Sequence, residues 1–284
     1  MITVSSVTKT YGSHRALDHV SFGVPDGAVT ALVGSTGAGR TTTLGVIAGL
    51  VRPDHGRVLI DGHPLAEARR PGALVGLQLT DDWLPEEFTL ESHLAHVCAL
   101  QGLPRGRVDD LLACVGLHGA RHRRIKDCTP AMRQRLGIAS ALSGDPHHLL
   151  LDQPTRGLDA DSTAWLHGIV RATATRGGAV LITADRLGDV APVADHVVML
   201  DRGRVVCSGP RASFQTADET MSYVESDHLE LVVGALQERG FQVVREGQGA
   251  VVHAEPAAVG RVAFDHAPGL THLSTLARRS GGAA

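Results

Sequence analysis

The sequence predicts an α/β fold with a mixed sheet and a helical insertion, followed by a small α+β module. Three observations support this prediction. A buried apolar strand at 28–33 runs directly into a glycine-rich turn and a helix, which is the usual beginning of a parallel α/β sheet. Residues 90–142 place apolar side chains at helical spacing. Further apolar strands at 148–151, 179–182 and 196–200 complete the sheet.

Strands are also expected at both ends of this first part of the chain. Residues 1–30 alternate between apolar and polar side chains in β fashion, with a turn at Pro25, Asp26 and Gly27. Gly203 opens a short hairpin that returns through Val205. The parallel sheet should therefore be accompanied by antiparallel strands.

The pattern changes after Pro210, which predicts a second domain. We expect a large domain at 1–212 with its helical insertion at about 88–146, a βαββαβ-like module at 215–278, and a Gly/Ala tail at 279–284. Within the module, the expected elements are a helix capped by Asp227 and ended by Gly240, a hairpin of 241–245 and 250–253, a helix from Pro256, and a strand at 270–273.

Composition limits the classes of partner. The 284 residues are 43% hydrophobic and 20% charged, as in soluble globular proteins. The net charge of −3 and the aromatic content of 3% offer neither a basic field nor stacking platforms, so no nucleic-acid partner is expected. No stretch approaches the ~20 apolar residues that span a bilayer, and the N-terminus has no signal pattern. These features predict a cytoplasmic protein.

The glycine-rich turn has the spacing of a phosphate-binding loop, except that arginine replaces the usual lysine. Glycines let backbone N–H groups turn toward a phosphate, and the following helix N-terminus adds partial positive charge. A hydroxyl at Thr41 is placed to ligate Mg²⁺. The nucleotide-binding residues expected here are Gly34, Ser35, Thr36, Gly37, Ala38, Gly39, Arg40, Thr41 and Thr42.

Over residues 1–210 the chain resembles the ATP-binding subunits of ABC transporters. Tyr11 in Lys9-Thr10-Tyr11-Gly12 matches the aromatic that stacks on adenine, and Asp152 in the apolar run 149–154 matches the second nucleotide motif. The resemblance implies that Asp152 holds Mg²⁺ with Thr41. It also implies that Asp159, in Gly157-Leu158-Asp159, lies in the loop that touches a partner subunit. The C-terminal module is similar to the extra domain of ATPases from two-subunit drug exporters.

The phosphate loop departs from the family at Arg40. Lysine is a compact charge that reaches the β- and γ-phosphates, whereas guanidinium is wide and planar. Lys9 and Lys126 are the only lysines in the chain, which indicates a general preference for arginine over lysine. The alternative to impaired nucleotide binding is therefore that Arg40 reflects this preference and that the loop tolerates it. The sequence leaves both interpretations open.

Two family catalytic positions are substituted. Gln153 stands where the resemblance implies a glutamate that polarises the attacking water, and losing a general base commonly costs ~10²–10⁴ in rate. Whether Gln153 is natural or engineered is left open. Asp185 stands where a histidine would reach the γ-phosphate, and a carboxylate there repels phosphate unless a cation or proton intervenes. The alternative is that Asp185 points to solvent.

The signature segment and the family glutamine are altered as well. Thr129 keeps a hydroxyl, but Pro130 lacks an N–H and Ala131 adds a methyl group before Met132, where backbone should approach phosphate. The glutamine position falls on Thr80. Gln78, two residues earlier, would share its strand face if the strand continues, which leaves partial rescue by Gln78 open.

These features predict an ATP-binding subunit of a bacterial ABC transporter, of exporter type, that binds ATP with Mg²⁺ and hydrolyses it weakly or not at all. It would form a head-to-tail homodimer or heterodimer, dock a membrane-spanning subunit near 80–100, and lie peripherally on the inner face of the cell membrane.

The alternative is a non-hydrolysing pseudo-ATPase that acts as a nucleotide-responsive regulator or scaffold. Soluble ABC proteins of repair or translation fit poorly, because the chain has neither a second ATPase unit nor a long coiled-coil insertion. The transported substrate is not readable from this sequence.

Overall fold

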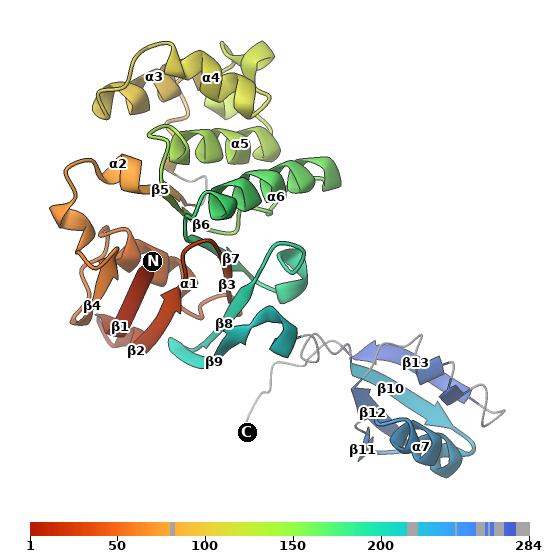
Figure 1. Cartoon of the computed structure of the whole chain (residues 1–284). Helices are drawn as coiled ribbons and strands as arrows, with labels where there is room; N and C mark the ends of the chain where they lie inside the picture. The colour runs from red at the N-terminus through yellow and green to blue at the C-terminus, as the bar shows by residue number, and fades with distance from the viewer. Residues whose placement is uncertain are drawn as a thin grey trace. The chain divides into compact units, whose positions relative to one another are not determined.

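The computed structural model describes residues 1–79, 83–214, 221–241, 243–253, 259–260, 262–263 and 270–276. The chain divides into two compact units, Met1–Ser213 and Phe214–Ala284, which are described one at a time (Figure 1).

A six-stranded mixed sheet forms the centre of the first unit. In sheet order its strands are β5 (Val75–Gln78), β6 (His148–Leu151), β7 (Val180–Ala184), β3 (Val29–Val33), β8 (His196–Asp201) and β9 (Arg204–Pro210). The first five are parallel to one another, and β9 returns antiparallel to β8. Every residue of β3, β6 and β7 is buried, which explains why these strands are mostly apolar. The predicted α/β class is confirmed.

A three-stranded antiparallel sheet packs beside it. Its strands are β2 (His14–Val24), β1 (Ile2–Tyr11) and β4 (His55–Ile60), in that order. The strand β4 has no counterpart in the sequence prediction, because most of its side chains are exposed or half-buried and it lacks a clear apolar alternation. Buried residues of β1, β2, α1 and the parallel sheet form one hydrophobic core between the two sheets.

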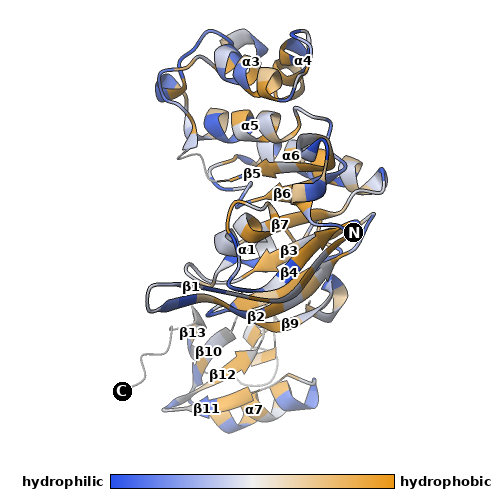
Figure 2. Cartoon of the chain, turned by 90° about the vertical axis from the view of Figure 1, so that its left-hand side faces the viewer, coloured by the Kyte–Doolittle hydropathy of each residue, from blue (hydrophilic) through white to orange (hydrophobic). Residues whose placement is uncertain are grey.

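Helices flank the mixed sheet and form the insertion. The α-helices of this unit are α1 (Arg40–Ile47), α2 (Pro71–Leu74), α3 (Leu90–Leu100), α4 (Arg107–Cys114), α5 (Pro130–Ala141) and α6 (Ala160–Thr175). Short 3-10 turns lie at Leu65–Glu67, His118–Ala120, Ile125–Asp127, Leu187–Asp189 and Arg211–Phe214. Figure 1 shows α3, α4 and α5 grouped beyond the β5 end of the sheet, and they share a hydrophobic core of their own. Figure 2 shows the hydrophobic colouring of the central strands and polar stretches on these helices.

The second unit is a four-stranded antiparallel sheet with a helix. The strands, in sheet order, are β11 (Val243–Glu246), β12 (Gly249–His253), β10 (Met221–Ser226) and β13 (Leu270–Leu276), and α7 spans Leu229–Glu238. Residues 259–260 and 262–263 are helical. One face of α7 packs on the sheet through Val232 and Leu236, as its apolar spacing predicts.

One detail of this unit differs from the sequence prediction. The N-cap of α7 is His228 rather than Asp227, because Ser226 Oγ accepts from the His228 backbone N (3.2 Å) and closes a turn that includes Asp227. Pro256, expected to begin a helix, and the tail at 279–284 lie outside the described residues.

Across the parts of the chain that the structure describes, none of the helices combines the length and the apolar character that crossing a bilayer requires.

Candidate functional site

The glycine-rich turn lies between β3 and α1, as the sequence predicts. Gly37 and Gly39 have left-handed φ angles of 83° and 103°, and Gly39 is the N-cap of α1. A Cβ at Gly39 would lie 2.6 Å from the Ala16 carbonyl oxygen, and one at Gly34 would lie 2.2 Å from the Leu200 carbonyl oxygen. Both positions therefore require glycine, whereas nothing lies within 4 Å of a Cβ at Gly37.

Three elements bring oxygen atoms together beside this loop. Asp152, which directly follows β6, is completely buried. Its Oδ2 accepts from Thr41 Oγ1 (2.8 Å) in the first turn of α1, and its Oδ1 accepts from Thr183 Oγ1 (2.5 Å) in β7. A carboxylate and a hydroxyl are the hard oxygen ligands that Mg²⁺ prefers, so the donor set fits this cation. Thr41 and Asp152 are the residues that would hold it.

Arg40 and Asp185 form an ion pair across the same edge of the sheet. The Arg40 side chain is only 5% exposed, and its Nη2 donates to the carboxylate of Asp185, which is 51% exposed. Within the described residues, Arg40 Nη1 is buried without a hydrogen-bond partner. Asp185 thus does not simply point to solvent: its charge is paired with the arginine that replaces the loop lysine.

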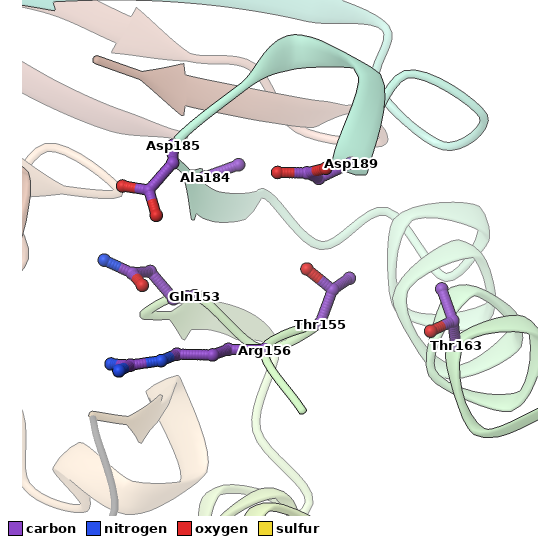
Figure 3. A pocket seen from close by; sticks show the side chains of 7 residues that line it. All are labelled: Gln153, Thr155, Arg156, Thr163, Ala184, Asp185 and Asp189. Carbon is purple, nitrogen blue, oxygen red and sulfur yellow. The ribbon is translucent and has the colours of Figure 1, made fainter. Parts of the chain in front are cut away.

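Gln153 and Asp185 line a cavity of about 380 Å³. Gln153 has a left-handed φ of 46°, and its backbone N donates to Thr183 Oγ1 (2.9 Å). Figure 3 shows the two side chains entering the cavity from the segments after β6 and β7, with the amide facing the carboxylate. Arg156 and Asp189 also line this cavity. A neutral amide, rather than a glutamate, therefore occupies the position that follows the buried Asp152.

Gln78 is buried against the insertion rather than free beside the loop. Its side chain is 1% exposed, and its Cγ lies 3.3 Å from the position of a Cβ on Gly137 of α5. Its Nε2 donates to the carbonyl of the adjacent Leu79, and its backbone carbonyl accepts from Asp152 N (2.9 Å). Thr80 lies outside the described residues, so partial rescue by Gln78 stays a hypothesis.

The exposed aromatic ring of Tyr11 stands at the end of β1. The residue is 48% exposed, and Lys9 Nζ lies 5.4 Å from the ring centroid. An exposed ring next to a cation keeps a π-face available for a flat base. The position is compatible with the predicted adenine contact.

The altered signature caps α5. Thr129 is the N-cap and its Oγ1 accepts from Met132 N (3.3 Å), while Pro130 occupies the first turn. A Cβ on Gly157 would lie 3.7 Å from Pro130 Cβ, so the signature and the loop at 157–159 are neighbours. Ala131, the next residue, is half-buried.

Asp159 caps the next helix. Its Oδ1 accepts from Ser162 N (2.8 Å) at the start of α6. Hydrogen bonds from Ser162 hold the pKa of Asp159 below its usual value, and the charge of Arg135 lowers it further. These interactions favour the charged form of the Asp159 carboxylate.

Sequence reasoning did not find two of these relationships. Thr183 bonds both Asp152 and Gln153, and a polar residue inside an otherwise apolar strand was the available signal. The Arg40–Asp185 pair joins residues 145 positions apart, and no local pattern links them.

Comparison with known proteins identifies the family to which this chain belongs. A family model described as ABC transporter matches residues 17–156. The daunorubicin/doxorubicin resistance ATP-binding protein DrrA of Streptomyces peucetius is 32% identical over 289 residues, covering 98% of this chain and 85% of that protein. The daunorubicin resistance ATP-binding protein DrrA3 of Streptomyces coeruleorubidus is 33% identical, covering 85% of this chain and 76% of that protein.

Solved structures show the same fold. The ATP-binding subunit of an ABC transporter aligns with a TM-score of 0.68 at 26% identity, covering 76% of this chain and 92% of that one. A dimeric ATP-binding cassette in a post-hydrolysis state, bound to ADP and Pi, aligns with a TM-score of 0.68 at 22% identity, covering 74% and 98%. The chain belongs to the family of ABC transporter ATP-binding domains and is homologous to the DrrA drug-resistance ATPases.

Proposed function

We propose that this chain is the ATP-binding subunit of a bacterial drug exporter, and that it binds ATP with Mg²⁺ while hydrolysing it weakly or not at all. The observation that carries the second part is the neutral Gln153 beside the buried Asp152, facing a carboxylate that is already engaged by Arg40. The export role is supported by homology to DrrA proteins, whose names assign them to drug resistance.

ATP binding is supported by three features of the loop. Glycine is required at Gly34 and Gly39, which lets the backbone approach its neighbours closely and leaves the side of Gly37 open. Asp152 and Thr41 present oxygen atoms for Mg²⁺. Arg40 places a positive charge at the first position of α1, and among the described side chains its buried Nη1 has no hydrogen-bond partner.

Slow hydrolysis follows from the groups that face the cavity. An amide at Gln153 can orient a water but cannot take its proton, which removes general-base assistance of ~10²–10⁴. Bound Mg²⁺ would neutralise phosphate charge, yet the residue after Asp152 would still offer the attacking water no proton acceptor, and the Asp185 carboxylate of the same cavity is engaged by Arg40.

The proposed assembly is a head-to-tail homodimer or heterodimer with a membrane-spanning subunit. The signature of one subunit would complete the site of the other. Trp83 and Phe88, exposed by 44% and 39%, supply apolar surface in the region near 80–100 where the membrane subunit would dock. The chain would then lie on the inner face of the membrane, with 1–212 as the ATPase domain and 215–278 as a module that stabilises the dimer.

A regulatory pseudo-ATPase is the second candidate, and one observation favours it. Pro130 and Ala131 occupy the first turn of α5, where a signature would present glycine backbone to phosphate. A dimer built from two such signatures would have no intact site, and it would respond to nucleotide without turnover.

The purified chain is expected to bind Mg-ATP at sub-millimolar concentration in isothermal titration calorimetry, and to bind it more weakly when EDTA removes the cation. Its turnover in a phosphate-release assay should lie far below the ~1 s⁻¹ of slow ordinary enzymes. Absence of ATP uptake at millimolar concentration would refute the binding proposal. A turnover near ~1 s⁻¹ would refute slow hydrolysis.

A further inference from the structure

The fold joins two substitutions that are far apart in sequence. Arg40 begins α1 after β3, and Asp185 directly follows β7. Because β3 and β7 are adjacent parallel strands, their carboxyl ends lie at the same edge of the sheet, and the guanidinium meets the carboxylate there. The loop arginine and the acidic residue that faces it therefore act as one unit.

The two terminal nitrogens of the Arg40 guanidinium differ in their hydrogen bonding. Nη2 donates to Asp185, whereas Nη1 is buried and has no hydrogen-bond partner among the described residues. A buried unpaired donor is unfavourable, so an acceptor at this place stabilises the site. The basic residue of a phosphate loop reaches the β- and γ-phosphates of a nucleotide. Nη1 is enclosed by protein, so a phosphate reaches this guanidinium only if the side chain moves, and Asp185 holds the other terminal nitrogen in place.

A nucleoside diphosphate and a nucleoside triphosphate would interact differently with the Arg40–Asp185 ion pair. A diphosphate can be held by the backbone N–H groups of the glycine-rich loop and leave the ion pair intact. A triphosphate brings another charged group to the same side of the loop, where it must either take Nη2 from Asp185 or lie beside its carboxylate. Like charges repel most strongly at short range and in partly buried surroundings. Repulsion by the Asp185 carboxylate therefore weakens the binding of the third phosphate.

The other carboxylates near the loop do not compete with a phosphate for the Arg40 side chain. Asp152 is fully buried and accepts from the hydroxyls of Thr41 and Thr183, in the arrangement expected of a cation ligand. Asp189 lines the same cavity as Asp185, but its Oδ1 lies 3.5 Å from Nη2 of Arg186. The carboxylate that engages Arg40 is that of Asp185.

We propose that Asp185 is a nucleotide-specificity residue: by holding one arm of Arg40, it makes the site bind nucleoside diphosphate at least as tightly as nucleoside triphosphate. The inference rests on the proposed function, because it requires a nucleotide in the loop. In this protein, ATP must either displace an internal carboxylate from the loop arginine or bind beside that carboxylate, whereas ADP binds without either cost.

Calorimetric titration of the full chain with Mg-ADP and Mg-ATP tests the proposal. In the wild type, the Kd for ATP should equal or exceed the Kd for ADP. Asp185→Asn should lower the Kd for ATP about tenfold and change that for ADP by less than about twofold, because only the triphosphate meets the carboxylate. Asp185→Glu keeps the charge and should retain the wild-type preference.

Asp189→Asn is the matched control, since it removes one negative charge from the same cavity without touching the Arg40 pair. It should leave the ATP-to-ADP affinity ratio within about twofold of the wild type. A wild type that binds ATP tenfold more tightly than ADP overturns the inference, and so does an equal change of the ratio in both Asn variants. Failure of both nucleotides to bind any folded variant would instead overturn the proposed function, and circular dichroism verifies the folding.

Discussion

A triple variant with Arg40→Lys, Gln153→Glu and Asp185→His is expected to hydrolyse ATP at least about 10²-fold faster than the wild type, measured as phosphate release at saturating Mg-ATP. The Gln153→Glu change would supply a proton acceptor, and general-base assistance commonly contributes ~10²–10⁴. The three changes belong together because the structure pairs Arg40 with Asp185. Asp185→His alone would place a group that can itself become cationic against the buried guanidinium, whereas the asparagine of the nucleotide-binding test still accepts a hydrogen bond.

Two further variants identify the cause of any gain in turnover. Gln153→Glu alone should give a smaller gain, because the ion pair still faces the third phosphate, and effects within a catalytic unit are not additive. Adding Asp152→Asn to the triple variant should return turnover to the wild-type level by weakening the Mg²⁺ site, which excludes a contaminating ATPase. A triple variant that binds ATP but gains no turnover would favour the pseudo-ATPase, with Pro130 and Ala131 as the remaining obstacle.

Gly39→Ala is expected to lower the free energy of unfolding of the first unit by about 3 kcal/mol and to abolish nucleotide binding. An alanine would be held at a φ of 103°, which costs about 1–2 kcal/mol in the left-handed region. Its methyl group would also lie 2.6 Å from the Ala16 carbonyl oxygen and 2.8 Å from Leu17 Cδ2, and such overpacking costs about 1–3 kcal/mol. The loop would have to shift to relieve this contact.

Gly37→Ala in the same loop is the matched control for strain without a clash. Its φ of 83° is also left-handed, but its Cβ would have no atom within 4 Å, so its cost should stay near about 1–2 kcal/mol. Urea unfolding followed by tryptophan fluorescence reports on the first unit, because Trp83 and Trp165 are the two tryptophans of the chain. Equal destabilisation by both substitutions would show that the packing around Gly39 does not matter.

Local signals predicted the elements that carry the loop. A continuous apolar run predicts a buried parallel strand, and the glycine spacing at 34–39 predicts backbone that turns around a phosphate. Both properties depend on neighbours in sequence, which is why β3, the loop and α1 agree with expectation. The strand β4 was not predicted, because most of its side chains are exposed or half-buried and show no apolar alternation. The cap of α7 was predicted one residue too early, because a hydrogen bond to Ser226 places Asp227 in a turn.

By itself, the sequence determined the α/β class, the phosphate loop and the kinship with ABC ATPases, since apolar runs and glycine spacing are properties of short segments. Only the tertiary structure decided that Arg40 and Asp185 neutralise each other and that Thr183 links Asp152 to Gln153. The physical reason is that strand order sets which loop ends share an edge of the sheet. Whether a buried charge is paired or repelled depends on that order, and no spacing along the chain encodes it.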